Sequence, residues 1–204
     1  MLKPISSTLQ GVISFTWPMI IISVIIMVSF RICYLIKSKQ PLVIHKELSM
    51  LIFGIYILCL FQVVTFQDDT SWATNNFIPF KEIMRYNITS RLFFKNVLGN
   101  MMMFLPFGFF VSYYLKSEKL TLPLFLILIA SISIEVVQLL IGRVFDVDDI
   151  MLNVLGGIIG YVIYMFSYRI YSKLPNFFKS LWFLNITFVI LLIVFMIFLL
   201  LLLV

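Results

Sequence analysis

The stretch LTLPLFLILIASISIEVVQLLIG, residues 120–142, decides the fold because it has the length and composition of a membrane-spanning helix. Its only ionisable side chain is Glu135. A charge at this depth costs about 2.5–3.5 kcal/mol even on lenient insertion scales, so such a residue normally faces protein or water and marks a functional site. The stretch therefore predicts a membrane protein with a buried polar site near Glu135.

The composition of the whole chain agrees. Of its 204 residues 62% are hydrophobic and 12% are charged, whereas about a quarter of the residues of a soluble domain are charged. We expect one all-α, polytopic membrane helical bundle over residues 1–204. About six segments have spanning length, at about residues 12–36, 47–66, 97–115, 120–141, 150–171 and 182–204. The net charge of +6 fits helix flanks that meet anionic head groups, so no nucleic acid is expected.

The distribution of lysine and arginine predicts the orientation. Nine of them flank the first, third and fifth connections: Arg31, Lys37, Lys39, Lys46, Lys116, Lys119, Arg169, Lys173 and Lys179. Six lie on the opposite side: Lys3, Lys81, Arg85, Arg91, Lys95 and Arg143. This majority favours both termini outside the cell. The acidic residues after Glu135 would then lie on the extracytoplasmic side, and the inverted orientation is the alternative.

A polar cluster follows Glu135. Gln138 shares its helical face, Arg143, Asp146, Asp148 and Asp149 form a short turn, and Asn153 lies one helical turn after Asp149. A purely structural account has Asp148 or Asp149 capping the fifth helix and Arg143 pairing with Asp146. That account leaves Glu135 and Gln138 unexplained, so we expect a functional polar pocket.

The third segment adds further polar groups. Asn96 and Asn100 share one face, and Pro106 should kink the helix. The two amides either bond to neighbouring helices or line the pocket with Glu135. In the fifth segment Gly156 and Gly160 form a ridge of small residues that admits another helix closely.

The loop string NFIPF, Asn76 to Phe80, is unusually apolar for its polar surroundings. We expect either an interfacial or re-entrant element or an ordinary surface helix that starts near Lys81. Carboxylates and amides would suit Mg²⁺ or Ca²⁺, but the spacing is not that of an EF-hand loop. Zinc is disfavoured because no histidine or cysteine accompanies the cluster. We therefore expect no metal site and no cofactor.

Four features together resemble the VanZ-like family of bacterial membrane proteins. They are NFIPF, the run from Asn100 to Phe109, the pair Glu135 and Gln138, and the run from Arg143 to Gly160, so the family-like core covers about residues 77–160. The resemblance implies a multi-pass protein of the bacterial cell membrane. The namesake of the family is associated with tolerance of teicoplanin, a lipid-tailed glycopeptide that acts on cell-wall precursors.

Three functions compete. The first is binding of a membrane lipid, a lipid-linked cell-wall precursor or a lipoglycopeptide, with apolar neighbours such as Phe104, Phe107 and Leu139 holding the lipid tail. The expected ligand-binding residues are Asn76, Asn96, Asn100, Glu135, Gln138, Arg143, Asp146, Asp148, Asp149 and Asn153. The second is a hydrolase or transferase acting on an envelope lipid, with Glu135, Asp146 and Asp149 as catalytic residues and Glu135 as general acid or base. The third is a flippase or transporter. It is disfavoured because the cytoplasmic half of the bundle carries almost no buried polar groups that could complete a path across the membrane.

Overall fold

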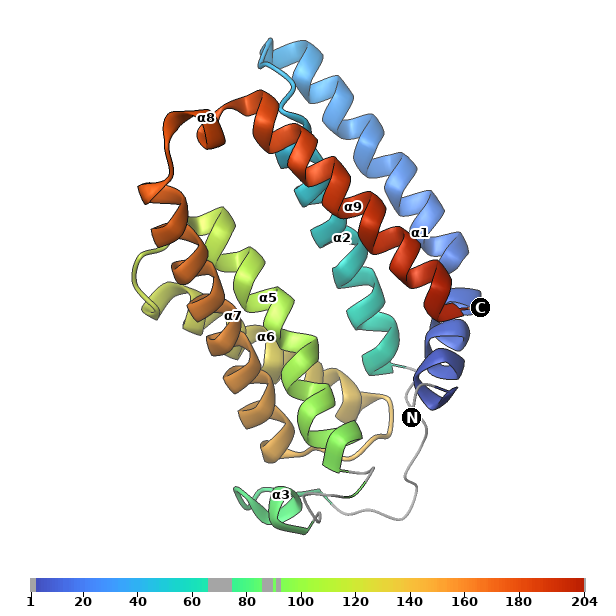
Figure 1. Cartoon of the computed structure of the whole chain (residues 1–204). Coiled ribbons are helices and arrows are strands. Elements are labelled where there is room, and N and C mark those ends of the chain that lie inside the picture. Colours follow the sequence, from blue (N-terminus) through green and yellow to red (C-terminus); the bar gives the residue numbers. More distant parts are fainter. Residues whose placement is uncertain (1–2, 66–74, 86–89, 91–92, 204) are drawn as a thin grey trace. The chain divides into compact units, whose positions relative to one another are not determined.

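The chain is mainly helical over the residues that the computed structural model describes, 3–65, 75–85, 90 and 93–203 (Figure 1). Arg91, one of the six cations counted on the side opposite the basic connections, lies outside these residues. The helices are α1 (Lys3–Ser38), α2 (Ile44–Thr65), α3 (Lys81–Arg85), the π-helical turn η1 (Phe94–Leu98), α5 (Gly99–Leu115), α6 (Thr121–Leu140), α7 (Val147–Lys173), α8 (Asn176–Lys179) and α9 (Leu181–Leu203).

Each of the six predicted spanning segments is a helix. In the described part of the chain five helices are long and apolar enough to cross a membrane: Trp17–Ser38, Ile44–Val64, Asn96–Leu115, Thr121–Leu140 and Val147–Lys173. The sixth segment corresponds to α9, a helix of 23 residues. The chain is therefore an all-α, multi-pass membrane protein, as the hydrophobic pattern predicts.

The chain divides into two compact units, residues 1–63 with 174–204 and residues 64–173. In the first unit, Arg31 of α1 forms a two-point ion pair with Glu47 of α2, with Nε–Oε2 and Nη2–Oε1 distances of 2.6 and 2.8 Å. The N–H of His45 donates to Asn185 Oδ1 at 3.0 Å, so α9 caps the first turn of α2. His45 thus lies in the first turn of α2.

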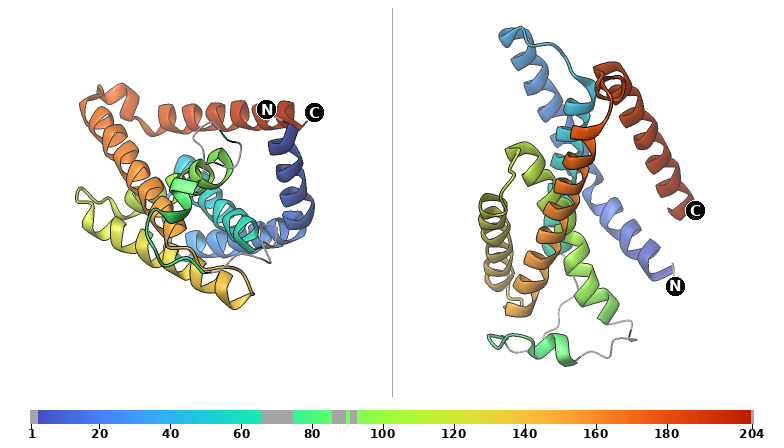
Figure 2. Two further views of the ribbon diagram at one scale, coloured as in Figure 1. Left: turned by 90° about the horizontal axis from the view of Figure 1, so that it is seen from below. Right: turned by 60° about the vertical axis from the view of Figure 1, so that its left-hand side comes forward.

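The second unit is built on close contact between α5 and α7, which lie side by side in the right-hand view of Figure 2. A Cβ atom added at Gly156 would collide with the carbonyl oxygen of Met101, and one at Gly160 with that of Leu105. A Cβ at Gly108 would likewise meet the backbone of Gly157. The predicted ridge of small residues is confirmed, and in membranes such ridges let helix backbones approach closely.

The third predicted segment remains helical on both sides of Pro106. The helix α5 includes Pro106 and follows directly on η1, whose π-helical turn begins five residues earlier than Gly99. The proline therefore does not end the helix. The aromatic ring of Phe104 beside it is fully buried, and its centroid lies 5.6 Å from that of Phe107.

The glycine contacts generate a stability prediction. Gly156→Ala and Gly160→Ala should each lower the free energy of unfolding by about 1–3 kcal/mol, because the added methyl group forces two backbones apart. Gly99→Ala is the matched control, since a Cβ there meets only the Phe94 carbonyl oxygen at 4.0 Å. Unfolding in detergent measures the difference, and equal stability of the three variants would contradict the proposed contact.

Candidate functional site

The candidate site is assembled where α6 ends and α7 begins. The helix α6 ends in a Schellman motif: Gly142 has a φ of 85°, its N–H donates to Leu139 O at 3.1 Å, and the N–H of Arg143 donates to Gln138 O at 2.9 Å. Glycine adopts this left-handed conformation without the steric cost of a side chain. The chain therefore reverses sharply just after the buried Gln138.

Gln138 and Arg143 share one acceptor after this reversal. Arg143 Nη1 donates to the carbonyl oxygen of Val64 at 2.6 Å, and Gln138 Nε2 donates to the same oxygen at 3.3 Å. Val64 lies in the last turn of α2, where carbonyl groups have no partner within the helix. The guanidinium thus satisfies a helix C-terminus. Among the described residues Arg143 forms no ion pair with Asp146, so the predicted pairing is wrong.

A short parallel bridge ties the NFIPF string to the turn before α7. Asn76 N–H donates to Phe145 O at 2.8 Å, and Val147 N–H donates to Asn76 O at 3.0 Å. The side chain of Asn76 is buried, and its Nδ2 donates to Asp146 Oδ1 at 2.8 Å. Asn76 therefore holds the loop to the acidic turn through both its backbone and its amide.

Asp146 is the cap of α7. Its Oδ1 accepts the N–H of Asp148 at 2.9 Å, which is the bond expected of an N-cap residue. Its own N–H donates to Glu135 Oε2 at 3.1 Å. Since the side chain of Glu135 is only 1% exposed, one use of this buried carboxylate is to hold the start of α7 against α6.

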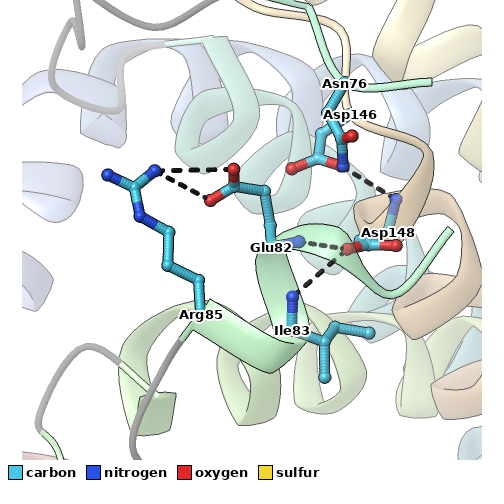
Figure 3. A network of polar contacts seen from close by, with 6 residues as sticks. All are labelled: Asn76, Glu82, Ile83, Arg85, Asp146 and Asp148. Carbon is cyan, nitrogen blue, oxygen red and sulfur yellow. Dashed lines mark hydrogen bonds and ion pairs between the residues drawn. The ribbon is translucent and has the colours of Figure 1, made fainter. Parts of the chain in front are cut away.

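Asp148 caps a different helix. Its carboxylate accepts the N–H groups of Glu82 and Ile83 at 2.7 and 3.2 Å, respectively (Figure 3). It also accepts the N–H of Phe80 at 2.5 Å. These groups belong to the first turn of α3, a helix of five residues that would be marginal alone. The prediction that Asp148 or Asp149 caps the fifth helix is therefore wrong in its details. Asp146 caps α7, and Asp148 acts across 65 or more residues of sequence.

The remaining polar residues connect three membrane helices. Asn100 Nδ2 of α5 donates to Asp149 Oδ1 of α7 at 2.5 Å, and Asn153 Nδ2 of α7 donates to Ser131 Oγ of α6 at 3.2 Å. Asn153 is 3% exposed, and its Oδ1 is the only buried side-chain nitrogen or oxygen without a hydrogen-bond partner in the described part of the chain. An atom of this kind requires an explanation, because buried polar groups are nearly always paired.

The electrostatics of the site are dominated by burial. Burial raises the pKa of Asp146 above its ordinary value, and the hydrogen bonds from Asp148 N–H and Asn76 oppose that shift. Glu135 on α6 and Asp149 on α7 each lie one helical turn from the hydrogen-bonded pair Ser131 and Asn153. No three His, Cys, Asp or Glu side chains gather as metal ligands in the residues that the structure describes.

The structure brings most of the predicted site residues together. Nine of the ten predicted binding residues take part in the contacts above, and Asn96 lies on η1, one turn before Asn100. Sequence reasoning missed Ser131, whose hydroxyl is fully buried against Asn153. The signal was available, since Ser131 lies four residues before Glu135 on the same face of α6.

The cap on α3 generates a prediction about local order. Asp148→Asn should remove one of two acceptor oxygens and leave buried N–H groups unpaired, at a cost of about 1–3 kcal/mol. The amides of Phe80, Glu82 and Ile83 should then lose protection in hydrogen exchange, while those of α5 keep theirs. The control is Glu82→Gln, which alters the half-buried partner of Arg85 on the same short helix. Unchanged protection in Asp148→Asn would contradict the cap.

The pKa of Asp146 generates a prediction about pH. Because its pKa is raised on folding, the folded state binds a proton more tightly than the unfolded state does. Stability should therefore fall as the pH rises from 3.8, the ordinary value, through the raised value. Asp146→Asn should lack this component, and the difference between the two unfolding profiles measures it. Identical profiles would show that Asp146 does not contribute.

Comparison with known proteins agrees with this geometry. The family model described as VanZ/LLP1 matches residues 53–172, which include α5, α6, α7 and the whole acidic turn. No curated protein matches the chain. No solved structure matches it either. Since the match covers more than half of the chain, the protein belongs to the VanZ/LLP1 family.

Proposed function

We propose that this protein binds the head group of an envelope lipid in a polar pocket formed by α5, α6 and α7. The ligand would be a lipid-linked cell-wall precursor or a lipoglycopeptide. The pocket would open on the extracytoplasmic face of the bacterial cell membrane, and binding would contribute to tolerance of teicoplanin-type antibiotics. The single observation that carries the proposal is the unpartnered Oδ1 of Asn153, buried between two membrane helices.

The cost of that unpartnered atom supports a ligand. An unpaired buried acceptor costs about 1–3 kcal/mol, and a membrane interior supplies no water to satisfy it. Glu135 lies one turn from Ser131 on α6, and Asp149 lies one turn from Asn153 on α7. These two carboxylates and the Asn153 oxygen would form one group of acceptors that follows the seam between the helices.

The chemistry of this group favours a ligand that donates hydrogen bonds. Two carboxylates and an amide oxygen accept hydrogen bonds and attract cations. The nearest guanidinium, that of Arg143, is already bonded to the Val64 carbonyl oxygen. We therefore infer that the pocket takes hydroxyl or ammonium groups, such as those of a sugar or an amino sugar, in preference to a phosphate.

An enzymatic function is the second candidate, and one observation favours it. Glu135 and Asp149 are carboxylates on α6 and α7, and each lies one helical turn from the hydrogen-bonded pair Ser131 and Asn153. Such pairs carry out acid–base chemistry when their environments differ. In that case Glu135 would be the general acid or base in a hydrolase or transferase that acts on the same envelope lipid.

Paired replacement of Ser131 and Asn153 separates binding from folding. The double variant Ser131→Ala, Asn153→Leu removes both polar partners together, which is close to neutral for stability and also eliminates the unpaired oxygen. We expect unchanged or higher thermal stability in detergent, together with loss of the lipid that co-purifies with the wild-type protein. Mass spectrometry of the purified protein measures this lipid. Ser133→Ala, which alters an exposed serine of α6, is the matched control.

Glu135→Gln distinguishes the two candidates. If the pocket only binds, this variant should lose at least about tenfold in affinity for the co-purifying lipid, which is the loss expected for one charge-assisted hydrogen bond. If the protein is an enzyme, the variant should retain an unprocessed lipid that the wild type converts. A wild-type protein that carries no more of any lipid than the double variant does would contradict both candidates.

A further inference from the structure

The segment before α5 presents an apolar tip, defined here as Phe77, Ile78, Phe80 and Met84. These side chains are 68%, 62%, 49% and 81% exposed, respectively. Two exposed cations, Lys81 and Arg85, lie among them in the sequence FIPFKEIMR. Four large exposed apolar side chains within eight consecutive residues require a partner, because exposed apolar patches of this kind mark interaction sites.

The apolar tip is held rigidly and at a cost. Phe80 has a φ of 65°, a conformation that is strained for a bulky residue. The carboxylate of Asp148 holds this residue through its N–H, and Asn76 fixes the start of the segment to Asp146. The rings of Phe77 and Phe145 stack with their centroids 5.3 Å apart. Since strain persists only where surrounding contacts impose it, its retention points to a function of the tip.

The same contacts set the level of the apolar tip relative to the membrane. Asp146 and Asp148 lie at the first turn of α7, which is a candidate membrane span, and α6 ends a few residues before them. The short helix α3 lies beyond that end of α5, α6 and α7 (Figure 1). The tip is therefore fixed at the plane where the spanning helices of this unit leave the hydrocarbon.

We propose that the apolar tip inserts into the head-group region of the protein's own membrane, with Lys81 and Arg85 at the level of the lipid phosphates. The combination of aromatic and aliphatic side chains with neighbouring cations is that of interfacial elements, which bind through apolar burial and attraction to anionic lipids. A bilayer fits this surface better than a soluble protein does, because the tip is fixed at the membrane surface by residues of a spanning helix.

Site-directed spin labelling in nanodiscs tests this proposal. The background variant is the full chain with Cys33→Ala and Cys59→Ala, the only two cysteines. Ile78→Cys carries the nitroxide at the tip. Lys119→Cys labels the exposed connection between α5 and α6, and Ile132→Cys labels an exposed position within the span of α6. The discs contain phosphatidylcholine with or without phosphatidylglycerol.

The readout is the ratio of collisions with oxygen, which concentrates in lipid, to collisions with a water-soluble nickel chelate. We expect a ratio at Ile78 several-fold above that at Lys119 and below that at Ile132. Adding Lys81→Gln and Arg85→Gln should remove any increase that phosphatidylglycerol produces. A ratio equal to that of Lys119 would overturn the proposal, and so would a label shielded from both reagents, because protein would then cover the tip.

This experiment is independent of the proposed function. It requires no bound ligand, because the tip is held by Asn76 and Asp148. A failed binding experiment would therefore leave the membrane contact standing. Conversely, a collision ratio that places the tip in water would not contradict the pocket proposed between the helices.

Discussion

The close contact between the backbones of α5 and α7 is the constraint on which the rest of the second unit depends. Gly108 and Gly157 touch, and they are 49 residues apart in sequence. Asn100 and Asp149, two helical turns earlier on each helix, have the same separation. The two helices run parallel, and their backbones touch at the glycines. This close approach brings the amide of Asn100 and the carboxylate of Asp149 together within the membrane. Larger residues at the glycines would separate this pair.

Four consecutive roles of the acidic residues follow from this arrangement. Glu135 holds the backbone N–H of Asp146, Asp146 caps α7, Asp148 caps α3 from a distance, and Asp149 accepts a bond from Asn100. Much of the negative charge therefore satisfies helix N-termini, where N–H groups lack partners and the helix dipole favours an anion. A dense cluster of carboxylates can stay buried here without a matching number of cations.

The structural uses do not account for every polar atom. If the cluster served folding alone, all of its buried groups should be paired, as they are in most proteins. Asn153 breaks this pattern in the part of the chain that the structure describes, one helical turn further along α7 than Asp149. Stability and ligand binding favour different residues at such a position. An apolar side chain would make the folded protein at least as stable, whereas a ligand that donates a hydrogen bond needs the amide oxygen.

The sequence by itself determined the all-helical membrane fold, the spanning segments and the glycine ridge, because hydrophobic length and the spacing of small residues act locally. It also identified Glu135, Gln138 and the acidic turn as the polar centre, since charge within hydrocarbon is rare. Only the tertiary structure decided which group each carboxylate binds. Asp148 reaches Phe80 from 68 residues away, and Arg143 reaches Val64 from 79 residues away. Such pairings depend on how the chain reverses at Gly142 and on which helix ends it brings together, and neither is encoded in local spacing.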